Sequence, residues 1–272
     1  MGKYKIAILG CGNIGTSLAK GLIASRQYDY DEVLVTEKRE FRAGQLKNLG
    51  FHVTDNNREA VKEAGIIVMA VKPQQFFDLA EEIKNDVTGE HTVISTITGV
   101  AFKDIESVLG RVPLVRIMPN IAMEINESMT CLSFRNTDNE QEKEIISLFD
   151  KLGKTLIIEE EMMGAATVVG ACGIAFALRF IRAMSQGGIE IGFDSEMALS
   201  ITAQTVKAAA QIILDSNDHP EKEIDRVTTP QGITISGLNE MEHQGLSSAI
   251  IRGLITSSRK LENLASKSEN VK

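Results

Sequence analysis

The chain has 272 residues, of which 43% are apolar, and a formal net charge of -8. A sizeable core is therefore available, whereas the negative charge argues against nucleic acid and anionic membrane surfaces as partners. No apolar run approaches the roughly 18 residues of a membrane span, and a strand begins almost at the first residue, so we expect no membrane, no signal peptide and a cytoplasmic location.

The first half of the chain alternates short apolar runs with amphipathic stretches. The runs that we predict as strands are Tyr4–Leu9, Glu32–Val35, Ile66–Val71, Thr92–Thr96 and Leu114–Ile117. The helices predicted between them are Asn13–Arg26, Glu40–Leu49, Asn57–Glu63, Gln74–Lys84 and Phe102–Leu109. Strands and helices that alternate at this spacing form βαβ units. The pattern therefore predicts an α/β fold with a Rossmann-type, doubly wound sheet.

Two further strands, near Met129–Phe134 and Lys154–Ile158, flank a predicted helix at Asn139–Leu152. After Glu161 the strand signal disappears. The remainder reads as helices at Met162–Gly187, Asp194–Asp215, Pro220–Val227, Pro230–Gln244 and Leu246–Ala265, with Asp194 or Ser195 as the N-cap of the second. We therefore predict a dinucleotide-binding domain at residues 1–160 and an all-helical substrate and dimerisation domain at residues 161–272.

The helix predicted at Met162–Gly187 is apolar on most of its faces, so it must be buried. It is either the central helix of its own domain or a helix covered by a second subunit. A domain of this size has few places to bury such a helix, and we therefore favour an intertwined homodimer, or a higher homo-oligomer built from such dimers.

The first predicted strand leads directly into Gly10-Cys-Gly-Asn-Ile-Gly15, where a helix begins. This is the GxGxxG pattern in the context of strand, loop and helix that dinucleotide sites require. Gly10 permits the tight turn, Gly12 lets the backbone approach a pyrophosphate, and Gly15 lets the helix lie close to the strand. The amides of Asn13, Ile14 and Gly15 then face the phosphates. A glycine turn without a ligand is the alternative.

The end of the second strand carries Glu37, Lys38 and Arg39. Glu37 lies about twenty residues beyond the glycine loop, where an acid binds the free ribose 2′-hydroxyl of NAD. Lys38 and Arg39 instead favour the 2′-phosphate of NADP, unless they are simply a solvated helix start. The sequence thus leaves NADPH and NADH both open as the cofactor.

Side chains typical of other active sites form no pattern. The three cysteines have no CxxC or zinc spacing, so the sequence predicts no metal site and fits a reducing compartment. The four histidines show no pairing with acids, and no GxSxG motif is present.

The sequence contains three further motifs: Val71-Lys-Pro-Gln74, Met118-Pro-Asn120 and Val227-Thr-Thr-Pro-Gln-Gly-Ile-Thr234. The last of them is followed by Gly237-Leu238 and Gly245. Together with the glycine loop they resemble the pyrroline-5-carboxylate reductase family over nearly the whole chain. The resemblance implies reduction of 1-pyrroline-5-carboxylate to L-proline by hydride transfer from NAD(P)H, in proline biosynthesis. It also implies that Val71, Lys72, Pro73 and Asn120 border the nicotinamide, and that the helical domain dimerises.

The last motif is also a helix start in physical terms. Thr229 suits the N-cap and Pro230 the first helical position, so the amides of Gln231, Gly232 and Ile233 are expected to lack helical partners. Such amides attract an anion, and a substrate carboxylate is the natural guest. Thr234 is then placed to hydrogen-bond the ring nitrogen. A capped helix exposed to water is the alternative.

The chain departs from the family's pattern at two places. Gly170-Ala-Cys-Gly-Ile-Ala-Phe176 stands where members commonly have Ser-Gly-Ser-Gly-Pro-Ala-Tyr, and Thr229 and Gln231 replace a serine and a glycine. The alternatives are a β-hydroxyacid-dehydrogenase-like oxidoreductase and a non-catalytic NAD(P)-binding regulator of the same fold. The former uses a lysine in the long helix, whereas Met162–Gly187 contains only Arg179 and Arg182 as basic residues.

Overall fold

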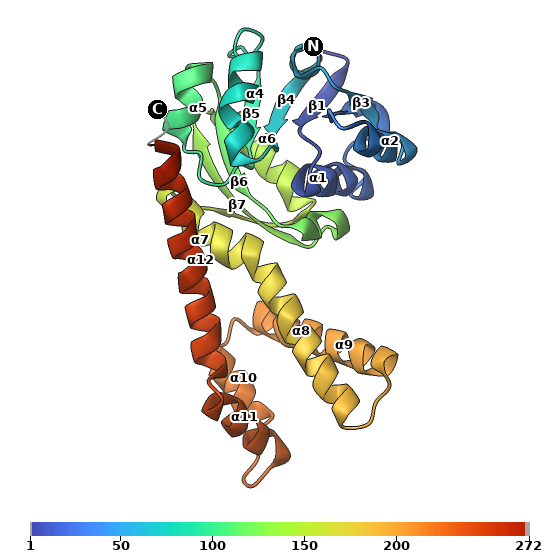
Figure 1. Cartoon of the computed structure of the whole chain (residues 1–272), viewed down its shortest axis with the longest axis vertical. Coiled ribbons are helices and arrows are strands. Elements are labelled where there is room, and N and C mark those ends of the chain that lie inside the picture. Colours follow the sequence, from blue (N-terminus) through green and yellow to red (C-terminus); the bar gives the residue numbers. More distant parts are fainter. Residues whose placement is uncertain (1, 270–272) are drawn as a thin grey trace. The chain divides into compact units, whose positions relative to one another are not determined.

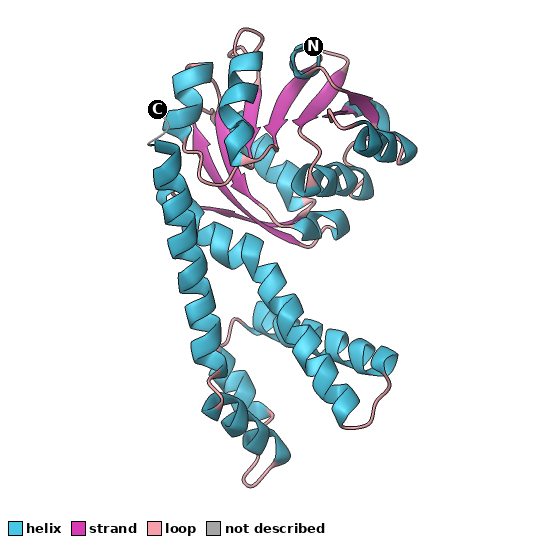
Figure 2. Ribbon diagram, viewed as in Figure 1, coloured by secondary structure: helices cyan, strands magenta, loops and turns pink. Residues whose placement is uncertain are grey.

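A single eight-stranded sheet organises the first part of the chain in the computed structural model, which describes residues 2–269 (Figures 1 and 2). The strand order is β3-β2-β1-β4-β5-β6-β7-β8, and every pair is parallel except the antiparallel pair β6–β7. The first six strands of this order form a doubly wound sheet, which confirms the predicted fold class. The strands are β1 (Tyr4–Leu9), β2 (Val33–Thr36), β3 (His52–Thr54), β4 (Ala64–Met69), β5 (Thr92–Ser95), β6 (Leu114–Met118), β7 (Ser128–Arg135) and β8 (Gly153–Ile157).

Alternate residues of the central strands enter two separate cores. Ile6 and Ile8 face one core, whereas Ala7 and Leu9 face the other, because successive side chains of a strand point to opposite faces. Helices α1, α2 and α6 supply residues to the first core, and α3, α4 and α5 supply residues to the second. Their bounds are α1 (Asn13–Ala24), α2 (Glu40–Asn48), α3 (Asn57–Lys62), α4 (Phe76–Ile83), α5 (Phe102–Leu109) and α6 (Asn139–Asp150).

The edge strand β3 is the one strand that the sequence pattern does not predict. It has three residues, all of intermediate burial, so it carries no apolar run. Short 3-10 turns, for instance at Pro73–Gln75 and Ile121–Ile125, replace the first part of some predicted helices or follow a strand.

The helical part contains α7 (Met163–Ala166), α8 (Gly173–Glu190), α9 (Ser195–Ser216), α10 (Pro220–Arg226), α11 (Ile233–His243) and α12 (Leu246–Glu269). Asp194 caps α9 as predicted, since its side chain accepts hydrogen bonds from the amides of Glu196 and Met197. The long helix predicted at Met162–Gly187 is not uniform. Its residues Thr167–Cys172 form a π-helical turn between α7 and α8, and such turns occur frequently at functional sites.

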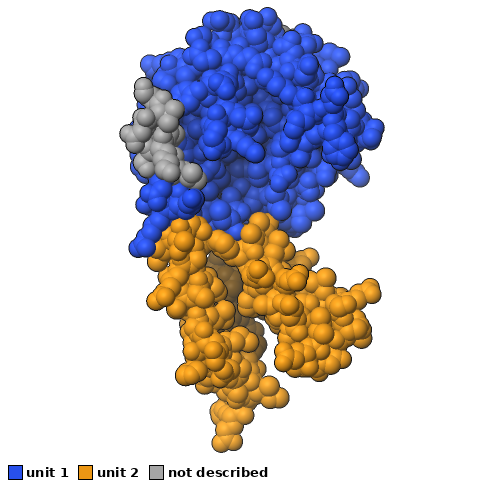
Figure 3. Space-filling model, viewed as in Figure 1, with its two compact units in different colours: residues 1–172, 258–272 blue, residues 173–257 orange. Residues whose placement is uncertain are grey.

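The chain divides into two compact units (Figure 3). The first comprises residues 1–172 together with 258–272, and the second comprises residues 173–257. The π-helical turn thus belongs to the first unit and α8 to the second.

Two helical runs are long and apolar enough to cross a membrane by length and composition, Glu160–Glu190 and Ser195–Ser216. The sequence reading, which saw no apolar run of that length, missed both because scattered polar residues interrupt them. Only 11% of the apolar window of each run is buried within the single chain. Length and composition alone do not separate a membrane span from a helix that another subunit covers.

Candidate active site

The glycine loop lies at the carboxyl end of β1, between β2 and β4. From β1 the chain adds β2 and β3 along one edge of β1, and it then returns to add β4 along the other edge. The strand order therefore reverses at β1. In doubly wound sheets the crevice outside the strand ends at this point is the usual ligand site. The loop after β4, which contains Val71, opens at the same edge because β1 and β4 are parallel.

The three glycines of the loop have different reasons to be glycine. Gly10 has a φ of +94°, and a Cβ there would lie 2.6 Å from Cγ1 of Val71. A Cβ on Gly15 would lie 2.4 Å from the Gly10 carbonyl oxygen. A Cβ on Gly12, by contrast, would meet no atom of the described residues within 4 Å. The open space above Gly12 is where the backbone is accessible to a ligand.

The start of α1 is free to bind an anion. Gly12 is its N-cap and offers no side-chain hydrogen bond to the first turn. The amides of Asn13, Ile14 and Gly15 belong to that turn, where N–H groups have no intrahelical partner. The loop itself is held from below, because the amides of Gly10 and Cys11 donate to the side chain and carbonyl of Thr36, at 3.1 Å each. These residues fit a dinucleotide pyrophosphate.

Glu37 is buried at the end of β2 and is held by Arg39. Its Oε1 accepts from the Arg39 Nε at 2.9 Å and backbone amide at 3.0 Å, and its Oε2 accepts from Nη2 at 2.8 Å. The hydrogen bonds from the Arg39 side chain lower the pKa of the Glu37 carboxyl below its usual range. The acid predicted at the ribose position is therefore a carboxylate whose two oxygens already accept hydrogen bonds from the Arg39 guanidinium.

A second arginine, which the sequence reading missed, joins this group. Arg42 Nε donates to the Cys11 carbonyl at 2.7 Å and lies 3.8 Å from Oε2 of Glu37. No local sequence signal marks Arg42, because the contact spans 31 residues. Lys38, which the sequence placed here, points its Nζ at Oε2 of Glu82 on α4, 3.4 Å away.

The Val-Lys-Pro segment follows β4. Val71 is partly buried against Gly10, whereas Lys72 and Pro73 are exposed and begin a 3-10 turn. These exposed side chains lie at the strand-end edge of the sheet, which is compatible with the predicted border of a nicotinamide.

Asn120 follows β6 and is buried, and both polar atoms of its side chain are hydrogen-bonded within the protein. Its Oδ1 caps the 3-10 turn at Ile121–Ile125 by accepting from the Ala122 amide at 3.0 Å. Its Nδ2 donates to the Gly170 carbonyl at 3.2 Å, within the π-helical turn. Asn120 therefore ties the loop after β6 to the segment where the chain departs from the family's Ser-Gly-Ser-Gly pattern.

The segment around Thr229 lies in the second unit, and its helix begins later than predicted. The N-cap of α11 is Gly232 rather than Thr229, and the first helical residue is Ile233. Thr229 to Gly232 instead form a β-turn, in which the Gly232 amide donates to the Thr229 carbonyl at 2.9 Å. The amide of Gly232 is thus occupied, and the uncapped amides of the first turn start at Ile233 and Thr234. The sequence rule failed because Gln231 has a φ of +59°, which no helix accommodates.

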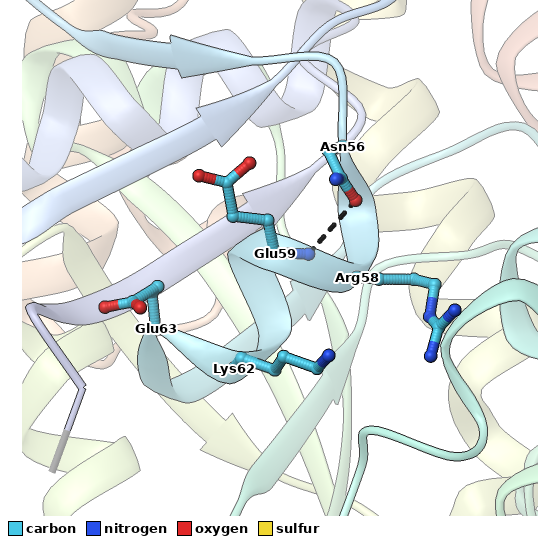
Figure 4. Close-up of a pocket in the computed structure, with 5 residues that line it drawn as sticks. All are labelled: Asn56, Arg58, Glu59, Lys62 and Glu63. Atoms are coloured by element: carbon cyan, nitrogen blue, oxygen red, sulfur yellow. Dashed lines mark hydrogen bonds between the residues drawn. The ribbon is translucent and has the colours of Figure 1, made fainter.

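Other features of the described residues are weaker candidates for a functional site. A surface hollow of about 310 Å³ lies around α3, and Figure 4 shows the residues that line it. Its cations Arg58 and Lys62 are already paired with Asp86. Burial, followed by the charge of Glu37, raises the pKa of the Cys11 thiol to about 12, so this thiol stays protonated near neutral pH. Among the described residues, no group of three or more His, Cys, Asp or Glu side chains is placed to hold a metal.

Comparison with known families gives two matches. The model of the pyrroline-5-carboxylate reductase dimerisation region matches residues 160–264, and that of NADP oxidoreductase, coenzyme F420-dependent, matches residues 5–99. The crystal structure of Plasmodium falciparum pyrroline carboxylate reductase, which has NADP bound, aligns with a TM-score of 0.89, covering 97% of this chain and 99% of that one. The identity is 23%, so this likeness concerns the fold.

Two relatives from Dictyostelium discoideum are more similar in sequence. Pyrroline-5-carboxylate reductase 1 is 46% identical over 95% of this chain, which spans about half (49%) of that longer protein. Pyrroline-5-carboxylate reductase 2 is 42% identical, over 94% of this chain and 91% of its own length. Because the second relative matches over almost the whole of both chains, the protein belongs to the pyrroline-5-carboxylate reductase family.

Proposed function

We propose that this protein reduces 1-pyrroline-5-carboxylate to L-proline with NADPH or NADH, as the last step of proline biosynthesis. The observation that carries the proposal is the glycine loop at the reversal point of the sheet, with open space above Gly12 and an uncapped α1, in a chain that belongs to this family. When bound, the reduced nicotinamide supplies the hydride.

The dinucleotide is held in this proposal by the first unit. The amides of Asn13, Ile14 and Gly15 bind the pyrophosphate, helped by the positive end of the α1 dipole. Glu37 and Arg39 lie at the adenosine ribose. Val71, Lys72 and Pro73 border the nicotinamide, and Asn120 holds the adjoining loop in place through its bonds to Ala122 and Gly170.

The substrate is held in this proposal by the start of α11. The uncapped amides of Ile233 and Thr234 bind the carboxylate, and the turn formed by Thr229, Gln231 and Gly232 shapes the approach. The Thr234 hydroxyl, exposed on the first turn, holds the proton at the imine nitrogen. A protonated imine accepts a hydride without a strong base, so a hydroxyl oxygen that accepts a hydrogen bond from its N–H is sufficient.

The proposal extends to the assembly and its compartment. We place a dinucleotide-binding domain at residues 1–160 and a substrate and dimerisation domain at 161–272, supported by the dimerisation-region match that starts at residue 160. A homodimer, or a larger homo-oligomer of dimers, covers the apolar faces of α8 and α9, of which little is buried in one chain. The cytoplasm is the proposed location, since the acidic chain and its reduced cysteines suit it.

The test is the oxidation of NADPH and of NADH by the purified protein with 1-pyrroline-5-carboxylate, followed through the absorbance of the reduced nicotinamide. We expect substrate-dependent oxidation with formation of L-proline. A folded protein that binds NAD(P)H but does not turn over would instead support a non-catalytic regulator. Turnover of a 3-hydroxy acid and not of the imine would support a dehydrogenase.

A further inference from the structure

The guanidinium of Arg42 bridges the glycine loop and the ribose acid. Besides the bond to the Cys11 carbonyl, Nη2 lies 3.4 Å from Oγ1 of Thr16 and 3.5 Å from Oδ1 of Asn13. Nη1 makes no hydrogen bond to the side chains or backbone of residues 2–263. The side chain is 28% exposed, on the wall of a hollow of about 410 Å³ beside α1 and α2. Arg42 therefore presents two free donors from a fixed position.

The charge around this position favours an anion. One carboxylate, Glu37, faces the two guanidiniums of Arg39 and Arg42, which leaves a net charge of one positive unit. Oε1 of Glu37 already accepts two hydrogen bonds from Arg39 and Oε2 accepts a third. A ribose diol thus finds little free capacity on this carboxylate, whereas a phosphate finds the guanidinium donors that bind it best.

Lys38 is less suited to this task than the sequence indicates. Its ammonium lies 3.4 Å from Glu82, and Glu82 also accepts from Asn57 Nδ2 at 3.0 Å. Asn57 in turn accepts a hydrogen bond from Thr36 at 2.7 Å, beneath the glycine loop. Lys38 is therefore directed toward α4, and Arg42 takes the place next to the ribose acid.

We infer that Arg42 is a specificity-determining residue that binds the 2′-phosphate of NADPH, with Arg39 as its partner and Glu37 as the counter-charge that orders both guanidiniums, so that the protein prefers NADPH to NADH. The inference rests on the proposed function only for the class of cofactor. An acid or an arginine near the end of the second strand is where dinucleotide folds distinguish the two cofactors. The structure adds that the acid here is neutralised and that the free donors belong to Arg42.

The experiment measures Kd for NADPH and NADH by direct titration, without the imine substrate, for the wild type and for Arg42→Met. Methionine keeps much of the aliphatic stem and removes the charge. We expect the Kd for NADPH to rise about 10- to 100-fold, the effect of losing hydrogen bonds to a charged group, and the Kd for NADH to change less than about threefold. Arg42→Lys, which keeps the charge but not the fork, should fall between.

Two further variants sharpen the test. Arg58→Met removes a guanidinium on α3 that is paired with Asp86, and this variant should change neither Kd. Glu37→Gln removes the counter-charge and should raise the preference for NADPH over NADH. As a probe, 2′,5′-ADP should displace NADPH from the wild type better than 5′-ADP, and this difference should disappear in Arg42→Met.

Equal weakening of NADPH and NADH in Arg42→Met would overturn the inference, because it would mean that Arg42 only supports the glycine loop. Unchanged NADPH binding would overturn it as well. These outcomes are independent of turnover: a protein that binds NADPH through Arg42 but does not reduce the imine would contradict the proposed function and leave this inference supported.

Discussion

At the scale of single residues, the glycines of the loop are needed for two different reasons. The fold requires two of them, and ligand binding requires the third. Gly10 and Gly15 are required by their own neighbours, since a Cβ on either would collide with Val71 or with the Gly10 carbonyl. Gly12 has no such neighbour, so its lack of a side chain matters when a ligand is bound. A substitution at Gly12 therefore tests binding without disturbing the fold.

We expect Gly12→Val to fold like the wild type and to lose most of its affinity for NADPH and NADH, because the new side chain fills the approach to the pyrophosphate. Titration of both cofactors and a thermal melt check the two halves of this expectation. Gly65→Val on β4 is the matched control, since that glycine is also open and is far from the loop in sequence. A folded Gly12→Val that binds normally would refute the site.

Thr234 tests the substrate end of the proposal. Thr234→Val keeps the shape and removes the hydroxyl, so kcat should fall at least about 3- to 10-fold, the value of one neutral hydrogen bond. NAD(P)H affinity should stay unchanged. Ser236→Ala is the control, because that hydroxyl is already used within α11, where it donates to the Gly232 carbonyl at 3.2 Å. Wild-type kcat in Thr234→Val would eliminate the proposed role.

At the scale of elements, the turn before α11 carries a backbone cost. Gln231 occupies the third position of the turn with a positive φ, as the third residue of a type II turn does, and glycine suits this position best. A Cβ on Gly232 would lie 2.5 Å from Oγ1 of Thr229, so the fourth position also needs a glycine. A bulky residue at Gly232 would therefore break the turn itself, in addition to any effect on substrate binding.

Gln231→Gly should stabilise the protein by about 0.5–1 kcal/mol, because relief of the left-handed conformation outweighs the extra entropy of glycine in the unfolded chain. The free energy of unfolding in urea is the measurement. Gln45→Gly, in the middle of the regular helix α2, should destabilise by about the same amount. Destabilisation by Gln231→Gly would mean that the side chain, rather than the backbone, decides the stability of this turn.

The π-helical turn is a second element whose form depends on its neighbours. Its Gly170 carbonyl finds a donor in Asn120, 50 residues away in the chain. The Thr167 hydroxyl bonds back to the Met163 carbonyl at 2.8 Å in the turn before it. This partly buried bond from Asn120 supports the local widening of the helix where it passes from α7 to α8.

At the scale of the whole molecule, the apolar helices are the feature that a single chain leaves unexplained. Leu178 of α8, and Leu199 and Leu214 of α9, each expose more than half of their surface. Large apolar side chains exposed on two helices that pack against each other indicate a contact with another molecule. A second copy is the partner that the dimerisation-region match supports.

Light scattering should therefore give at least twice the chain mass of 29.7 kDa. Leu178→Glu places a charge on the exposed apolar face of α8 and should shift the protein toward monomer. Phe41→Glu is the control, because Phe41 is 81% exposed on α2, in the other unit. A stable, active monomer of the wild type at low concentration would contradict the dimer.

The order and type of most elements follow from the sequence alone, because apolar periodicity records which face of a strand or helix is buried. The sequence alone also predicts three local patterns: the glycine loop, the Val-Lys-Pro segment and the Asp194 cap. The strand β3 was missed because it is short and has no apolar run, and the start of α11 was misplaced because a positive φ at Gln231 leaves no mark in the order of residues.

Contacts between distant residues required the tertiary structure. The sequence determined that an acid and basic residues follow β2, but only the fold showed that Lys38 turns to Glu82 and that Arg42 reaches the glycine loop. In the same way, Asn120 is a polar loop residue in the sequence and a buried tie to the π-helical turn in the structure. The reason is physical: local propensity acts over a few residues, whereas side-chain pairing is decided by which strand ends the sheet places side by side.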